Sequence, residues 1–301
     1  MRIVDAHHHI WRMADLPWLS GPPVPRIFGE YDAIRRDYSI EEYVAEATRA
    51  GVVQSVYVQT NWPPVRAVEE VAWVQSVADR HGFPHAIVGF ADLAAPDVEA
   101  TIDALCAFPG LRGVRQQLHW HVDRRFRFAE RPDLVNDPAW RRGLAAVGRR
   151  GLLFELQVFA GQMADSARLA RDFPDLPLVL MHAGMLEDRS PAGWTHWREG
   201  MHALAACPNI VVKLSALGTF VRACAVDLWR PVIEETVAMF GPERCMFGSN
   251  FPVEKLWTSY ADIVAVTAAC LAHLGERDQA AIWRDTAARV YRLPQPAHPG
   301  R

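Results

Sequence analysis

The 301-residue chain predicts an α/β fold, namely a single closed (β/α)8 barrel with an extended first βα loop. Eight short apolar runs alternate with helix-like segments from end to end, which is typical of a parallel barrel or an open, doubly wound sheet. The length suits a barrel of about 250 residues with insertions. No G-x-G-x-x-G or Walker-type loop follows any of the runs, which removes the commonest phosphate-binding reason for an open sheet. The barrel is therefore favoured.

The predicted strands are short runs rich in β-branched and other apolar residues, each bounded by turn or helix signals. In chain order they are Ile3–His9, Val52–Gln59, His85–Asp92, Gly113–His119, Leu152–Val158, Leu178–His182, Ile210–Ser215 and Cys245–Asn250.

The predicted helices are the amphipathic stretches between these runs. They are Ile40–Ala50, Ala67–His81, Asp97–Ala107, Pro138–Arg149, Gln162–Asp172, Trp197–Ala205, Val226–Phe240 and Tyr260–Leu274, with a further helix over Arg277–Tyr291. Ser39 followed by Glu42 forms a capping-box pattern at the start of the first of them. Glycines mark the predicted helix ends at Gly51, Gly82, Gly151 and Gly275.

Residues 11–38 hold several aromatic and proline residues without a clear periodicity. We interpret this segment as an ordered insertion in the first βα loop that covers the top of the barrel. Residues 1–293 then form one barrel domain without a linker, and residues 294–301, which contain three prolines, form a loose tail.

Composition limits the classes of partner. Half of the residues are hydrophobic and the net charge is −3, so there is no overall electrostatic reason to bind nucleic acid or an anionic membrane. The cluster Arg124–Arg127 is interpreted as a solvated surface. Five scattered cysteines without a C-x-x-C motif are expected to be small buried residues of a reduced, cytoplasmic protein. No apolar run approaches the roughly 20 residues of a membrane span. A homo-oligomer is compatible with the sequence.

The segment Ile3–Trp11 carries the strongest functional signal, because an apolar run leads directly into His7 and His9. Side chains on a strand alternate between its faces, so these two imidazoles point the same way in an extended segment. They can chelate a divalent metal ion or make two polar contacts with a substrate. The alternative is a histidine-rich terminus without a role. The flanking strand pattern favours an enzyme.

Polar residues also gather at the predicted ends of the other strands, where the chemistry of a barrel is concentrated. They are Tyr57, Gln59, Arg115, Gln117, His119, Glu155, Gln157, His182, Lys213, Ser215 and Asn250. Any one of them could be a satisfied core residue. Burying all of them without partners would cost several kcal/mol each. The set therefore predicts a polar, partly hydrated pocket. Of the 11 tryptophans, these six fall in predicted loops: Trp11, Trp18, Trp62, Trp120, Trp194 and Trp257. Several of them are expected to wall a ring-shaped or planar substrate.

At these residues the chain resembles the amidohydrolase superfamily, and within it the branch of fuconolactonase-like sugar-lactone hydrolases and 2-pyrone-4,6-dicarboxylate lactonase-like proteins. The resemblance covers nearly the whole chain and rests on Asp5–Trp11, Gly113–Gln117, His182 and Phe247–Val253. It implies a distorted (β/α)8 barrel and hydrolysis of a lactone or related carboxylic derivative. In this resemblance, His7, His9 and His182 match the histidines of the first and sixth strands.

Two departures from the family pattern affect the predicted chemistry. Asn250 stands where the superfamily usually has an aspartate, and its amide can accept a hydrogen bond but no proton. The fifth strand lacks the histidine of strongly metal-dependent members and offers Glu155 and Gln157 instead. A binuclear metal site is therefore not expected.

Two catalytic schemes follow. In the favoured one, His7, His9 and Glu155 hold one Zn²⁺ or Mn²⁺, which polarises the lactone carbonyl and lowers the pKa of bound water from about 15.7 to about 7. His182 is then the base or a fourth ligand. In the other, no metal is needed: His7, His9 and His182 form an oxyanion pocket, and Glu155 or a histidine activates water.

The predicted roles are as follows. The catalytic residues are His182, Glu155 and Asn250; the substrate-binding residues are Arg115, Gln117, His119, Gln157, Trp120 and Trp257; the metal ligands are His7, His9, Glu155 and His182. Arg115 would clamp a carboxylate or ring oxygen, unless it forms an ion pair with Glu155. The expected partner is a small-molecule substrate. The rival functions are a metal-dependent decarboxylase or C–C hydrolase on the same barrel, and a catalytically inactive barrel that binds a sugar acid.

Overall fold

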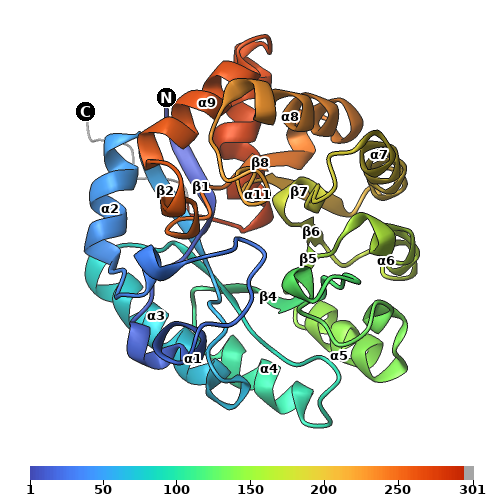
Figure 1. Cartoon of the computed structure of the whole chain (residues 1–301). Coiled ribbons are helices and arrows are strands. Elements are labelled where there is room, and N and C mark those ends of the chain that lie inside the picture. Colours follow the sequence, from blue (N-terminus) through green and yellow to red (C-terminus); the bar gives the residue numbers. More distant parts are fainter. Residues whose placement is uncertain (295–301) are drawn as a thin grey trace.

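The computed structural model describes residues 1–294 and shows eight parallel strands at the centre of the molecule, surrounded by helices (Figure 1). Neighbouring strands pair in chain order from β1 to β8. Their bounds are β1 Ile3–His8, β2 Val52–Val58, β3 Ala86–Gly89, β4 Leu111–Gln117, β5 Leu153–Gln157, β6 Leu178–Leu180, β7 Ile210–Leu214 and β8 Cys245–Phe247. The predicted (β/α)8 barrel is confirmed.

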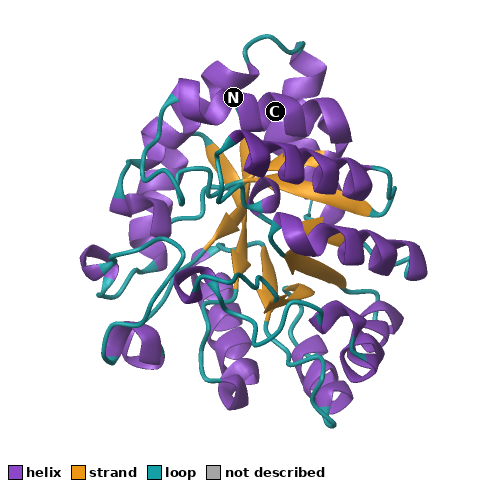
Figure 2. Cartoon of the chain, turned by 45° about the vertical axis from the view of Figure 1, so that its right-hand side comes forward, coloured by secondary structure: helices purple, strands orange, loops and turns teal. Residues whose placement is uncertain are grey.

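Most of the helices lie outside the strands, as Figure 2 shows, and bury their apolar faces against them. They are α1 Pro17–Ser20, α2 Ile40–Arg49, α3 Ala67–His81, α4 Val98–Cys106, α5 Pro138–Arg149, α6 Ala160–Asp172, α7 Pro191–Ala205, α8 Val226–Phe240, α9 Tyr260–Leu271, α10 Glu276–Ala280 and α11 Thr286–Val290. The predicted cap of α2 is present, since the Ser39 side chain accepts a hydrogen bond from the Glu42 N–H at 3.3 Å. Within residues 1–294, no helix is long and apolar enough to cross a membrane.

Several predicted boundaries are wrong. All eight strands end one to three residues earlier than expected. At β6 and β8 the reason is that His182 and Asn250 have left-handed backbones, with φ of 56° and 57°, that cannot continue a pleated strand. Helix α7 begins at Pro191, one and a half turns before the predicted Trp197. The predicted helix 277–291 is interrupted by a π-helical segment at Ala281–Asp285.

The extended first βα loop is present between β1 and α2. It contains α1 and the short helical turns Met13–Asp15 and Asp32–Ile34, and a bridge between Trp11 and Tyr38 closes its base. In Figure 1 this dark-blue segment crosses the near end of the barrel. The predicted tail lies outside the described residues, except for Pro294.

Buried contacts of Asp5 join β1 to β8 and so complete the barrel. Oδ1 of Asp5 accepts hydrogen bonds from the backbone N–H groups of His7 and Ser249, at 3.0 and 2.8 Å. Oδ2 accepts from the hydroxyls of Tyr43, Ser249 and Tyr260, at 2.9, 2.6 and 2.8 Å. Burial raises the pKa of Asp5, but five donors around one carboxyl group require acceptor oxygens and so stabilise the carboxylate.

The amino-terminal end of the barrel interior is filled with hydrocarbon. Inward-facing residues of seven strands, among them Val4, Val56 and Val179, pack against Ala287, Tyr291 and Leu293 from α11 and the segment after it. This plug closes one end of the barrel, so the polar residues can gather only toward the other end.

The cysteines are only partly as predicted. All five have free thiols, and Cys207, Cys245 and Cys270 are buried, whereas Cys106 is exposed on α4 and Cys224 is half-buried.

Candidate active site at the carboxyl ends of the strands

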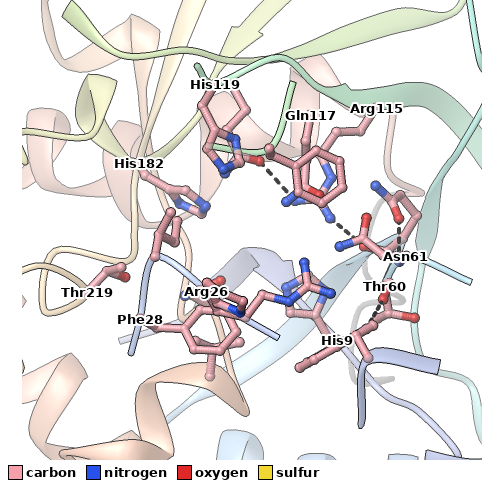
Figure 3. A pocket seen from close by; sticks show the side chains of 18 of the residues that line it. His9, Arg26, Phe28, Thr60, Asn61, Arg115, Gln117, His119, His182 and Thr219 are labelled. Atoms are coloured by element: carbon pink, nitrogen blue, oxygen red, sulfur yellow. Dashed lines mark hydrogen bonds between the residues drawn. The ribbon is translucent and has the colours of Figure 1, made fainter. Parts of the chain in front are cut away.

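A pocket lies beyond the carboxyl ends of the strands and holds about 700 Å³ of empty space, part of it open to solvent. This volume suits a small-molecule ligand. The side chains of His9, Arg115, His182 and Arg26 converge on it from β1, β4, β6 and the first βα loop (Figure 3). The lining contains arginine, histidine and amide side chains but no aspartate or glutamate.

Arg115 supplies a buried positive charge to this pocket. Its Nη2 donates to the Gln59 carbonyl at 2.5 Å, its Nη1 lies 3.5 Å from Oε1 of Gln157, and its Nε has no hydrogen-bond partner among residues 1–294. Burial lowers the pKa of Arg115 to about 10, so the guanidinium is charged at neutral pH. The alternative ion pair with Glu155 is absent within the described part of the chain. The cation is thus available to an anionic ligand.

Three imidazoles meet at the base of the pocket. The ring of His7 lies 5.0 Å from that of His9 and 4.8 Å from that of His182, measured between centroids. The predicted common orientation of His7 and His9 is therefore correct, and His8 faces outward, stacked 3.7 Å from Tyr43 of α2. His9 and His182 line the pocket, whereas His7 lies below it, fully buried.

The surroundings keep all three imidazoles neutral. Burial lowers the pKa of His9 to about 3, and the charge of Arg115 adds to this effect. Burial, followed by the charges of Arg115 and Lys213, lowers the pKa of His182 well below its ordinary value. The pKa of His7 is also lowered well below its ordinary value, first by burial and then by the charge of Lys213. The rings can therefore exchange hydrogen bonds at neutral pH but are weak proton acceptors.

Hydrogen bonds assign the two nitrogens of these rings. His9 Nδ1 lies 2.7 Å from the Val58 carbonyl and must carry the proton, which leaves a lone pair on Nε2. His182 Nδ1 lies 2.8 Å from the Ser215 hydroxyl, which fixes the ring orientation. His7 Nδ1 lies 3.4 Å from the ammonium of Lys213, which can only donate, so the proton of His7 is assigned to Nε2.

Glu155 is not placed as the metal ligand or base that the sequence predicts. Its Oε1 accepts hydrogen bonds from Lys213 Nζ and the Tyr291 hydroxyl, each at 2.6 Å, in a fully buried layer between the hydrocarbon plug and the imidazoles. Burial lowers the pKa of Lys213 to about 8. Glu155 does not line the pocket. Its carboxylate forms an ion pair with Lys213 of β7, which was predicted from the sequence only as a polar residue at a strand end.

Asn250 lines the pocket on the β8 side. Its backbone N–H donates to the His7 carbonyl at 2.7 Å, and its Nδ2 lies 3.5 Å from Oε1 of Glu254, one turn further along the chain in the short helix Val253–Leu256. His182 and Asn250 thus both have left-handed backbones, and each side chain is turned by the loop that follows its strand. Such strain in non-glycine residues is concentrated at functional sites.

Of the other residues predicted to contact the substrate, some line the pocket and some do not. Gln117, His119 and Gln157 line the pocket, and burial together with Arg115 lowers the pKa of His119 to about 3. Of the loop tryptophans, Trp11 and Trp18 line the pocket, whereas Trp120 and Trp257, the two assigned to substrate binding, do not. Trp120 lies in a separate groove beside α6 and α7. Trp257 turns away from the pocket and donates to Oε2 of Glu254 at 2.7 Å.

Several pocket residues were missed by the sequence analysis. From the first βα loop come Arg26 and Phe28; from the other loops come Thr60, Asn61, Arg125, Arg127, Phe128, Thr219 and Val253. The aromatic and arginine content of residues 11–38 was the available signal for the first group. The cluster Arg124–Arg127 is not simply solvated as predicted, because Arg125 and Arg127 face the pocket.

The residues present do not fit the predicted metal ion. Within residues 1–294, no three or more histidine, cysteine, aspartate or glutamate side chains form a metal-ligating group. Moreover, Glu155 is paired with Lys213, and the ammonium of Lys213 also lies 3.4 Å from Nδ1 of His7, where a positive charge opposes a metal ion. The carboxylate that would offset the metal's charge is thus missing from the set.

Comparisons with known proteins agree with the fold. A family model described as "Amidohydrolase" matches residues 4–293. An uncharacterized protein of Sinorhizobium fredii is 38% identical over 293 residues, which cover 97% of this chain and 98% of the relative. An L-fucono-1,5-lactonase of Burkholderia ambifaria is 31% identical over 303 residues, covering 98% and 97% of the two chains.

Among solved structures, an amidohydrolase from Burkholderia multivorans crystallised with bound zinc superposes with a TM-score of 0.83 at 28% identity. The match covers 98% of this chain and all of that one.

Proposed function

Because this chain belongs to the amidohydrolase family, we propose that it is a hydrolase that opens a lactone by attack of water in the pocket around Arg115, His9 and His182. One observation carries the proposal: a buried guanidinium without an acidic partner in the described residues faces neutral imidazoles in a pocket lined by no carboxylate. Such a pocket stabilises negative charge, which is what develops on a lactone carbonyl during hydrolysis.

The roles follow from the hydrogen-bonding capacity of each side chain. Arg115 donates to the carbonyl oxygen or to a carboxylate of the substrate through Nη1, which makes only a 3.5 Å contact with Gln157 among residues 1–294. The Nε2 atoms of His9 and His182 reach the pocket and orient the substrate or the attacking water. Lys213 lies beneath them, 3.4 Å from Nδ1 of the neutral His7, and adds positive potential to the base of the pocket. A lactone is an activated ester and needs less electrophilic assistance than an amide, so these donors are a sufficient set.

A metal ion has no step in this proposal. The zinc of the Burkholderia multivorans structure supports metal binding by that relative. In the present chain, the pairing of Glu155 with Lys213 and the amide of Asn250 leave no carboxylate at the three imidazoles. The arginine-rich lining and the relatives' lactonase activity together favour a lactone that carries a carboxylate or several hydroxyl groups.

A panel of neutral and carboxylated lactones, monitored by acid release, tests the proposal. We expect turnover of at least one lactone, with kcat/KM at least tenfold higher for a carboxylated substrate than for its neutral analogue, because Arg115 is unpaired. Absence of turnover on the whole panel, with sugar-acid binding retained in calorimetry, would instead support the inactive binding barrel.

A further inference from the structure

A second buried carboxyl group, Glu254, lies directly beneath the pocket wall and has no part in the proposed function so far. Glu254 is fully buried, and Thr219 and Asn250, two of its hydrogen-bond partners, both line the pocket. The hydroxyl of Thr219 donates to Oε1 of Glu254 at 3.3 Å, and Nδ2 of Asn250 lies 3.5 Å from the same oxygen. Trp257 binds the other oxygen. The carboxyl group is therefore one side chain away from the cavity.

The local backbone is shaped to admit this carboxyl group. A Cβ atom at position 218 would lie 2.6 Å from Oε2 of Glu254 and 2.2 Å from Nε1 of Trp257, so only glycine allows the pair to pack there. Thr219 follows directly and is turned toward the cavity, as Figure 3 shows for its side chain on the His182 side.

The proposed hydrolysis needs a proton acceptor, and the pocket itself offers a poor one. Among residues 1–294, no carboxylate lines the pocket, and the amide of Asn250 cannot accept a proton. The imidazoles of His9 and His182 are neutral, but their pKa values are strongly lowered. At a pKa of about 3, His9 binds a proton roughly three orders of magnitude more weakly than an unperturbed histidine.

We propose that Glu254 is the proton acceptor for the attacking water and acts through the hydroxyl of Thr219; this inference rests on the proposed lactone hydrolysis. By the same contacts Glu254 is a positioning residue for Asn250, because an ionised carboxylate only accepts and so holds the amide NH₂ group toward itself. The amide oxygen of Asn250 is then presented to the pocket, where it can accept a hydrogen bond from the water.

The proton steps balance through this path. As the water oxygen bonds to the lactone carbonyl carbon, one water proton passes to Oγ1 of Thr219, and the proton of that hydroxyl passes to Oε1 of Glu254. When the ring C–O bond breaks, the leaving alkoxide takes a proton back along the same path. The products are a hydroxy acid and a restored enzyme, and no oxidant or other reactant is needed. The long hydrogen bonds to Oε1 are expected to shorten when substrate closes the pocket.

The electrostatic surroundings suit this role. Burial raises the pKa of Glu254 to about 7, which is close to the value that serves a general base at neutral pH. The titratable group packed nearby from the segment before α8 is the thiol of Cys224, and across Asn250 lies His9. The adjacent Lys255 is paired with Glu42 and Glu46 and does not neutralise Glu254.

The test compares pH profiles of kcat/KM for conservative variants. The wild type should lose activity as the pH falls through about 7, because the carboxyl group must be ionised to accept a proton. Glu254→Gln keeps the shape but should lower kcat at least about 100-fold and abolish this acidic limb. Thr219→Val removes the hydroxyl at nearly constant shape and should also lower kcat and abolish the acidic limb. Thr219→Ser keeps a hydroxyl and should retain activity within about tenfold of wild type.

A matched control is Glu187→Gln. Glu187 is a half-buried carboxyl whose pKa is also raised by burial, but it lies in the separate groove beside Trp120. This variant should keep the wild-type profile. The melting temperature of each variant is measured alongside, because a purely structural role would change stability without removing the acidic limb.

The outcomes separate this inference from the proposed function. If Glu254→Gln or Thr219→Val keeps the acidic limb and most of kcat, the proton path is wrong. If Glu254→Gln fails to fold, the Thr219 pair decides. If the wild type hydrolyses no lactone, the proposed function fails. The ionisation of Glu254 can then still be measured by infrared spectroscopy. Its C=O band is identified as the one that disappears in Glu254→Gln, and if that band does not titrate near pH 7, the inference is wrong.

Discussion

At the residue scale, the sequence predicted which polar side chains converge, but it did not predict their hydrogen-bond and ion-pair partners. Inward barrel positions favour aliphatic residues, so His9, Arg115 and His182 stood out, and the structure places them at one pocket. Their roles stay predictions. The pairing of Glu155 with Lys213 and Tyr291 depends on contacts across 58 and 136 residues, which periodicity does not encode. Glu254 was missed because a single carboxylate after a strand end has no distinctive pattern.

His182 provides the first residue-scale prediction. His182→Ala removes the Nε2 group that faces the pocket and the Nδ1 contact with Ser215, so turnover should fall by about 100-fold or more. The melting temperature should change little, because His182 lies on the pocket wall. Steady-state kinetics and a thermal melt check this, and a variant with wild-type kcat would remove His182 from the mechanism.

At the element scale, the order of strands and helices was predictable, whereas their ends and the loops were not. The alternation of apolar runs and amphipathic stretches identified all eight strands, and the Ser39–Glu42 cap identified the start of α2. The left-handed residues that end β6 and β8 are set by local tertiary contacts, which the sequence does not reveal. The first βα loop has no periodicity, so Arg26 and Phe28 could not be assigned to the pocket in advance.

The joint between β1 and β8 gives an element-scale prediction. Asp5→Asn replaces an acceptor oxygen by an NH₂ group opposite donors, so it leaves buried donors unsatisfied. We expect the free energy of unfolding to fall by about 3 kcal/mol. Because His7 and Asn250 flank this joint, turnover should fall as well. Urea denaturation and hydrogen exchange of β1 and β8 amides check the prediction, and a change below about 1 kcal/mol would contradict it.

Asp5→Ala is the matched comparison, since it removes the acceptor without introducing a new donor. If Asp5→Asn were as stable as the wild type while Asp5→Ala were not, the carboxyl group of Asp5 would be protonated in the native protein.

At the scale of the whole molecule, charge is distributed unevenly. The chain carries a net charge of −3, yet Arg26, Arg115, Arg125 and Arg127 all line the one pocket, and the carboxylates of residues 1–294 are left out of its lining. The composition therefore concealed an anion-attracting site, because a small net charge says nothing about where the charges lie. Such a site draws anionic substrates from solution with a rate that falls as salt is added.

Metal dependence is predicted at this scale, from the whole set of donors. Prolonged treatment with a chelator should leave kcat within about twofold of its starting value, because Lys213 and Arg115 occupy the charge positions that a cation would need. Elemental analysis of the untreated and treated protein accompanies the assay. Loss of activity that stoichiometric Zn²⁺ restores would contradict the proposed roles of His7 and Glu155.

The plug formed by Ala287, Tyr291 and Leu293 also has a consequence for biogenesis. These residues are synthesised after all eight strands, yet they fill the interior that the strands enclose, and the Tyr291 hydroxyl binds Glu155 at its centre. During translation, an emerging chain that ends before α11 would have an open barrel with an unfilled interior. Truncation ahead of Tyr291 should for the same reason yield aggregating chains, however complete the catalytic rim.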